Sequence, residues 1–213
     1  MIKRPNLFYF NTTKIILANV LFYFIALIMM WIVPNFINYI ALTPSYVLHG
    51  KYLWTILTSM FMHGSPFHLF ANMVSLLFLG SFLERLIGRK RFFWVYMSSG
   101  LVASLFYILF ALIFNGDLNM SAVGASGAIF GVAGMLAILT PKMPIYVMFI
   151  PIAMPMWFGV ILIIAVLWIL SATVGLPIGN AAHLGGLLTG VVYAFYLKNK
   201  YQRKARLIAN HFS

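Results

Sequence analysis

Long apolar stretches alternate with short polar segments along the whole chain. A helix that crosses the hydrocarbon core of a bilayer needs roughly 20 mostly apolar residues. Six stretches approach or exceed that length, over residues 14–40, 67–86, 92–114, 124–140, 154–172 and 181–197. This pattern predicts an all-α, polytopic membrane protein built as a bundle of six transmembrane helices.

The segment from Ala41 to Pro66 is too broken to be a span. It contains Pro44, Gly50 and Gly64, with tryptophan and tyrosine residues between them. These aromatic residues prefer the membrane–water interface. The segment is therefore predicted to be a loop with short helices that lie at the interface.

No stretch is long and polar enough to form a separate soluble domain. Residues 1–213 are predicted to form one membrane domain, with a six-helix core over about residues 14–197 and a basic tail over 198–213. The first apolar stretch is too long for a cleaved signal peptide, so it is interpreted as a retained span.

Composition supports the same class of protein. Hydrophobic residues make up 63% of the chain and charged residues 8%, which is too little charge to cover a soluble domain of this size. The net charge is +12, but the basic residues lie in short clusters between apolar stretches, a pattern typical of membrane topology and not of nucleic-acid binding. The chain has no cysteine, which excludes disulfides and thiol chemistry.

The distribution of the basic residues predicts the orientation. Thirteen of the 14 Lys and Arg residues fall in the two terminal segments or in the loops on the same side of a six-span protein, and Lys51 is the exception. Because basic loops stay in the cytoplasm, both termini are predicted to be cytoplasmic. The protein is expected to be integral to a membrane, taken to be the cell membrane.

Four polar residues lie at the predicted outer ends of three spans. His68 and Asn72 open the second span, Ser126 opens the fourth and His183 opens the sixth. With a rise of about 1.5 Å per residue, each lies within roughly two turns of its helix end. Singly, such a serine usually serves helix packing, and such a histidine serves a core hydrogen bond or a proton relay. Their common depth favours a shared site that opens to the outer side.

Serine becomes a nucleophile when a base takes its proton, and histidine is the usual base. The chain has only two acidic residues, Glu84 and Asp117. Glu84 lies at the other end of the second span, where a structural ion pair with the Arg89–Arg91 cluster is expected. Asp117 lies in an outer loop without a route to His183. The predicted catalytic unit is therefore a dyad of Ser126 and His183.

Small residues predict how these two side chains meet. Gly127 and Gly131 are four residues apart, as are Gly186 and Gly190. Glycines at this spacing let membrane helices approach closely. His183 shares a helix face with Gly186 and Gly190. Packing of the sixth span on the fourth is expected to bring His183 beside Ser126.

Acyl transfer also needs donors for the oxyanion of the tetrahedral intermediate. The backbone N–H of Ser126 is one candidate. His68 and Asn72, four residues apart on one helix face, are two more. His63 is separated from them by Gly64 and Pro66, and is assigned to the outer loop with a supporting role.

Three motifs together resemble those of a known family. They are His63 with His68 and Asn72; Gly124, Ser126 and Gly127; and Ala182-His183 followed by Gly186 and Gly190. In this order, on the second, fourth and sixth spans, they are similar to the motifs of the rhomboid intramembrane serine proteases. The resemblance covers about residues 14–197.

The resemblance implies a nucleophile at Ser126, a base at His183, and an oxyanion hole formed by His68, Asn72 and the Ser126 N–H. It implies hydrolysis of peptide bonds in or near transmembrane segments of membrane proteins. It also implies a lateral gate formed by the fifth span, over residues 154–172, and a capping loop over residues 173–180. The presence of both Ser126 and His183 disfavours the catalytically inactive branch of the superfamily.

Two positions depart from the pattern of the family. Many members carry a tyrosine four residues after the nucleophile, stacked on the histidine, and this chain has Phe130 there. Phenylalanine keeps the stacking face and loses the hydroxyl. The first outer loop also lacks the Trp-Arg pair of some members. Substrate preference therefore does not carry over.

Other functions fit parts of the pattern. A proton-coupled transporter or channel would use His68, Asn72 and His183 as a relay, but would favour polar residues at mid-depth. A zinc hydrolase would use His63, His68 and His183. A non-catalytic protein would bind transmembrane helices without cutting them. The preferred hypothesis is a protease. Its expected partners are membrane-protein substrates and the lipid bilayer, with no cofactor, metal or nucleic acid. The sequence predicts no particular oligomeric state.

Overall fold

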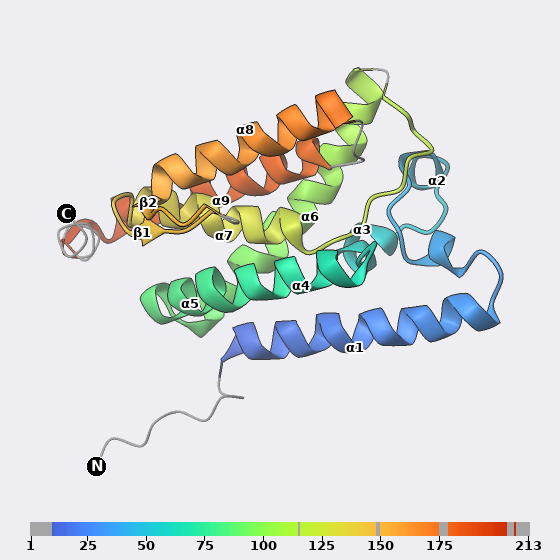
Figure 1. Cartoon of the computed structure of the whole chain (residues 1–213), viewed down its shortest axis with the longest axis horizontal. Helices are drawn as coiled ribbons and strands as arrows, with labels where there is room; N and C mark the ends of the chain where they lie inside the picture. The colour runs from blue at the N-terminus through green and yellow to red at the C-terminus, as the bar shows by residue number, and fades with distance from the viewer. Residues whose placement is uncertain (1–9, 115, 148–149, 175–178, 204–206, 208–213) are drawn as a thin grey trace, which may run out of the picture.

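The computed structural model describes residues 10–114, 116–147, 150–174, 179–203 and 207. These residues are mostly helical (Figure 1). The α-helices are α1 (Asn11–Ile32), α2 (Pro44–Leu48), α3 (Thr55–Thr58), α4 (Pro66–Ser75), α5 (Ser81–Ile87), α6 (Arg89–Ile113), α7 (Ser126–Leu139), α8 (Met156–Val174) and α9 (Asn180–Lys200). The prediction of an all-α protein is confirmed.

Three predictions fall partly outside the described residues. They concern the N-terminal segment at 1–9, the capping loop at 175–178 and the basic tail at 204–206 and 208–213.

Four helical segments of the described chain are long and apolar enough to cross a membrane by length and composition: α1, α4 through α5, α6 and α8. Helix α7 is apolar but has 14 residues. Helix α9 has 21 residues, several of them polar, and falls outside this set. The polytopic membrane class is therefore confirmed, and the count of six spans stays a prediction.

The first span ends earlier than predicted. It was expected to reach Ile40, but α1 ends at Ile32 and a 3-10 turn, η2 (Phe36–Tyr39), follows. The cause is Pro34, which disfavours helical backbone at the residue before it. Val33 is accordingly extended, with φ −112° and ψ 115°.

The next segment contains the short helices α2 and α3 and a second 3-10 turn, η3 (Ser59–Phe61), so the prediction of a loop with short helices between Ala41 and Pro66 is confirmed.

Two local features were not predicted. The second span contains a π-helical turn, η4 (Leu76–Gly80), between α4 and α5. A Cβ at Gly80 would lie 2.8 Å from Leu76 Cδ1, so this turn is closely packed. A short antiparallel hairpin, β1 (Pro144–Ile145) and β2 (Met154–Pro155), precedes α8. Such short strands carry no hydrophobic alternation by which a sequence could reveal them.

Helix α7 is the most enclosed long helix of the bundle. Ten of its 14 residues are buried, and it packs against α6, α8 and α9. The start of α1 and the end of α9 lie at one end of the bundle, and α2 and α3 lie toward the other (Figure 1). Helices α4, α7 and α9 carry the polar residues of interest near their starts. These starts lie away from the end of the bundle where α1 begins (Figure 1).

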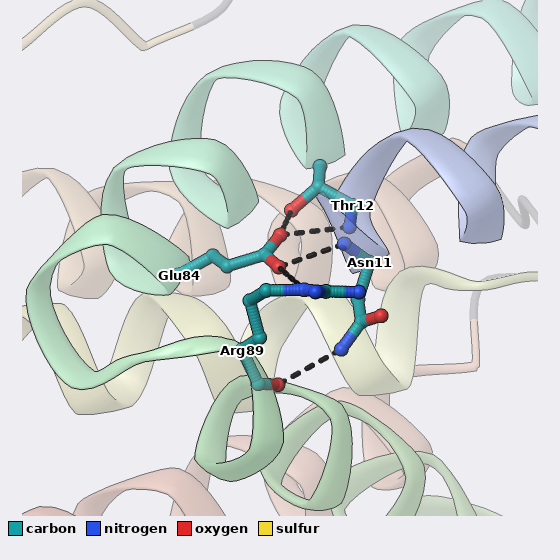
Figure 2. A network of polar contacts seen from close by, with 4 residues as sticks. All are labelled: Asn11, Thr12, Glu84 and Arg89. Carbon is teal, nitrogen blue, oxygen red and sulfur yellow. Dashed lines mark hydrogen bonds and ion pairs between the residues drawn. The ribbon is translucent and has the colours of Figure 1, made fainter. Parts of the chain in front are cut away.

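Glu84 joins α1 to the α5–α6 turn through a buried network (Figure 2). Its side chain is 1% exposed. The carboxylate accepts hydrogen bonds from the backbone N–H groups of Asn11 and Thr12, at 2.7 and 2.8 Å, and from Thr12 Oγ1 at 2.6 Å. Arg89 Nε lies 4.0 Å from Oε1. The expected ion pair is therefore present, and the carboxylate also caps the start of α1 from another helix.

We expect Glu84→Ala to lower the free energy of unfolding by about 3–5 kcal/mol, because it removes the acceptor of two backbone N–H groups and of the Thr12 hydroxyl at the start of α1. Unfolding in mixed detergent micelles measures this. Asp117→Asn is the matched control, since this exposed carboxylate accepts a bond from Asn119 N two residues away. A loss no larger than that of the control would contradict the capping role.

Candidate active site

Ser126 is the first residue of α7, at the end of a turn that requires glycine. Gly124 has φ +132°, a conformation that side chains with a Cβ rarely adopt. A Cβ there would also lie 2.8 Å from His68 Cε1 and 3.0 Å from His68 Nε2. The Gly124 N–H donates to the carbonyl of Ser59 at 2.9 Å. The turn thus holds Ser126 and the His68 ring next to each other.

His183 contacts Ser126 directly. Its Nε2 lies 2.8 Å from Ser126 Oγ. The Phe130 ring stacks on the imidazole, with centroids 4.6 Å apart and planes at 29°. His183 is buried, and its Nδ1 has no hydrogen-bond partner among the described residues. The pair therefore forms without a third, acidic residue to orient the imidazole.

Glycines let α9 lie against the backbone of α7. A Cβ at Gly186 would overlap the carbonyl oxygen of Gly127, and a Cβ at Gly190 would overlap that of Gly131. A Cβ at Gly127 would lie 2.5 Å from that of Ala103 on α6. This close approach is the one expected from the glycine spacing, and it is what brings His183 to Ser126.

The His68 ring lies beside the turn at Gly124. The Gly64 N–H makes a long hydrogen bond of 3.4 Å to His68 Nδ1. In a neutral imidazole, a nitrogen that accepts leaves the hydrogen on the other nitrogen. The hydrogen is thus assigned to Nε2, the ring nitrogen that would lie 3.0 Å from a Cβ at Gly124. Ser65 caps α4 by accepting from the His68 backbone N–H at 3.1 Å, which orients this first turn.

Asn72 lies one turn further along α4 and is buried. Its Nδ2 donates to the carbonyl of His68 at 2.9 Å, so the amide bonds within its own helix and not to Ser126 or His183. A side-chain amide carries two N–H donors, which leaves one for another acceptor.

His63 supports the turn from the outer loop. It is fully buried, and its Nε2 accepts from the Ala125 N–H at a long 3.5 Å. Its ring lies edge-on to that of His68, with centroids 5.1 Å apart. Burial, together with the neighbouring His68, lowers the pKa of His63 to about 3. His63 is thus a neutral acceptor that holds the residue before Ser126.

Contacts between the outer loop and the segment before Ser126 complete the site and were not foreseen. Leu42 and Ala122 exchange two backbone hydrogen bonds, of 3.0 and 2.8 Å, and Thr43 Oγ1 lies 2.8 Å from Ser121 Oγ. These contacts tie the outer loop to the segment that leads into Ser126. Backbone groups are the same at every residue, so no sequence signal marks the two bonds between Leu42 and Ala122.

The described residues offer no group of three His, Cys, Asp or Glu side chains arranged to hold one metal ion. His63 and His68 are neighbours, while His183 pairs with Ser126. The arrangement therefore suits acyl transfer by a serine better than a three-histidine ligand set.

Comparison with known proteins identifies the class. Residues 50–200 match the family model of the Rhomboid domain, which is more than half of the chain. The chain belongs to the rhomboid family. Together with its apolar helices, this makes it an integral membrane protein.

Several curated proteins are similar. Rhomboid protein 1, mitochondrial, of Saccharomyces cerevisiae is 34% identical over 160 residues, which are 73% of this chain and 45% of that protein. RHOMBOID-like protein 1 of Arabidopsis thaliana is 36% identical over 158 residues, which are 73% of this chain and 37% of that protein. The chain thus spans less than half the length of these relatives.

One relative bears on activity. Inactive RHOMBOID-like protein 8 of Arabidopsis thaliana is 37% identical over 95 residues, which are 44% of this chain and 25% of that protein. Family membership alone therefore does not establish catalysis, and the side chains at the site must carry that argument.

Proposed function

We propose that this protein is an intramembrane serine protease that hydrolyses peptide bonds in or near transmembrane segments of membrane proteins. One observation carries the proposal: the 2.8 Å contact between His183 Nε2 and Ser126 Oγ. A base at this distance can take the hydroxyl proton as the oxygen attacks a carbonyl carbon. The family of the chain supports the same reaction class.

The first half of the reaction acylates Ser126. Oγ forms a bond to the scissile carbonyl carbon while its proton passes to His183 Nε2, giving a tetrahedral intermediate. The imidazolium then returns this proton to the nitrogen of the leaving amine as the peptide bond breaks. The Phe130 ring stacked on the imidazole, and not an acid, holds the orientation. Water, activated by the same imidazole, hydrolyses the ester and frees Ser126.

The oxyanion is stabilised by donors around the start of α7. The Ser126 N–H is free of intrahelical bonding by its position at the helix start. His68 Nε2, assigned as a donor, lies next to Gly124. Asn72 keeps one amide hydrogen for an acceptor. Such donors each contribute roughly 10²–10³-fold to the rate of acyl transfer.

The proposed orientation puts both termini in the cytoplasm and the site toward the outer side. Four basic residues lie around the α5–α6 turn, at the end of the bundle where α1 begins: Arg85, Arg89, Lys90 and Arg91. Basic residues at one end favour the cytoplasmic side. A substrate helix would reach Ser126 from the lipid, with α8 as the lateral gate.

A fluorophosphonate probe tests the proposal directly. The detergent-solubilised chain should be labelled at Ser126, and labelling should persist in the presence of a metal chelator. A reconstituted transmembrane peptide should be cut under the same conditions. An unlabelled and inactive preparation, shown to be folded, would overturn the proposal and favour non-catalytic helix binding. Loss of activity with the chelator would favour the zinc hydrolase.

A further inference from the structure

Two cations lie against one tyrosine where α6 begins and α9 ends. The Arg91 guanidinium lies over the Tyr201 ring, 4.9 Å from its centroid, and Nη2 donates to the Tyr201 hydroxyl at 3.0 Å. The Lys200 ammonium lies 5.9 Å from the same centroid. Tyr196 also contacts Lys200, accepting a hydrogen bond of 2.9 Å from Nζ.

Neither acidic side chain of the chain is available to neutralise this pair. Glu84 is buried and accepts from Asn11 and Thr12. Asp117 follows the far end of α6, a helix of 25 residues that is about 37 Å long. Like charges held close together repel, and an anion between them would offset this.

The surroundings of the pair also favour an anion. No described side chain caps the start of α6 at Gly88, and the positive end of this long helix dipole lies beside Arg91. Arg91 Nη1 reaches back to the Ile87 carbonyl at 3.4 Å, which keeps the guanidinium at this helix start.

Exposed aromatic residues lie one helical turn away from the two cations. Trp94, 59% exposed, lies one turn along α6 from Arg91, and Tyr196, 49% exposed, lies one turn before Lys200 on α9. Aromatic side chains of this kind gather at the membrane interface. The surface therefore changes from cationic to apolar within one helical turn, which matches an amphiphile with a charged head.

We propose that Arg91, Lys200 and Tyr201 bind the phosphate of an anionic phospholipid headgroup, with the acyl chains along the apolar surface below. The guanidinium offers paired N–H donors to phosphate oxygens, and the ammonium adds a second positive charge. Tyr201 acts by positioning both cations. The site does not depend on proteolysis, because it lies at the opposite end of the helices from Ser126.

Native mass spectrometry of the full chain in detergent tests this, with phosphatidylglycerol and phosphatidylcholine as added lipids. Wild type should retain phosphatidylglycerol preferentially. Arg91→Gln and Lys200→Gln should each weaken its binding about fivefold. Tyr201→Leu should weaken it as well, although the net charge is unchanged. Lys90→Gln is the matched control, since it removes an exposed charge one residue from Arg91 and should change binding less than twofold.

Three results would overturn the proposal. Equal retention of the two lipids would remove the need for a headgroup charge. A Lys90→Gln effect as large as that of Arg91→Gln would mean that any basic residue at this surface serves equally. Displacement of phosphatidylglycerol by an excess of inorganic phosphate would assign the site to free phosphate instead of lipid. Cleavage by the variants, measured in parallel, should stay at the level of wild type.

Discussion

Ser126→Ala is expected to lower kcat for cleavage of a transmembrane substrate by about 10⁴-fold or more, because it removes the atom that forms the acyl bond. The substitution removes one oxygen from a half-buried side chain at a helix start, so the fold should persist. Initial rates on a reconstituted substrate, with thermal unfolding measured alongside, separate the two effects.

His183→Ala should cause a loss of similar size, and the double variant should lose little more. Residues that act as one catalytic unit are strongly non-additive. Ser98→Ala is the control, since this exposed hydroxyl bonds only to the Val95 carbonyl within its own helix among the contacts described. Turnover retained by Ser126→Ala, or losses that add in the double variant, would remove the dyad from the mechanism.

Gly190→Ala is expected to reduce both stability and activity. The new Cβ would overlap the carbonyl oxygen of Gly131, which is backbone and cannot rotate away. Helix α9 must then move from α7, at a cost of about 1–3 kcal/mol or more for overpacking. Because α9 carries His183, a displacement of about 1 Å at the site would slow cleavage by roughly 10²-fold.

Gly186→Ala should behave in the same way, since its Cβ would overlap the Gly127 carbonyl oxygen. Gly179→Ala is the matched control before the same helix, because among the described residues its Cβ would meet only the Cβ of Ala182, at 3.8 Å. Unfolding in detergent and initial cleavage rates measure the two effects. Wild-type values for Gly190→Ala would show that the glycine contact does not position the histidine.

The membrane class and the helical content were predictable because they depend on local properties. Apolar length determines which segments can enter a bilayer, whatever their neighbours. The spacing of Gly186 and Gly190 on the face of His183 likewise follows from helix geometry. These local rules were enough to pair His183 with Ser126 and to assign Glu84 to the opposite end of its helix.

Local rules failed where contacts between distant segments decide the structure. The carboxylate of Glu84 caps a helix that begins 73 residues earlier in the chain, so its role as a cap appears only when α1 and α5 are side by side. The π turn at Leu76–Gly80 brings Gly80 close to Phe92 of α6 and Thr12 of α1, both distant in the sequence. The outer loop docks through the backbone groups of Leu42 and Ala122.

By itself, the sequence determined a polytopic helical protein with a serine and three histidines near the ends of its helices. The tertiary structure decided which atoms contact each other. His183 Nε2 contacts Ser126 Oγ, the Gly64 N–H contacts His68 Nδ1, and the Ala125 N–H contacts His63 Nε2. The physical reason is that these properties depend on different parts of the chain. Hydrophobicity acts on each segment alone, whereas a hydrogen bond between segments needs two backbones placed to within a few tenths of an ångström.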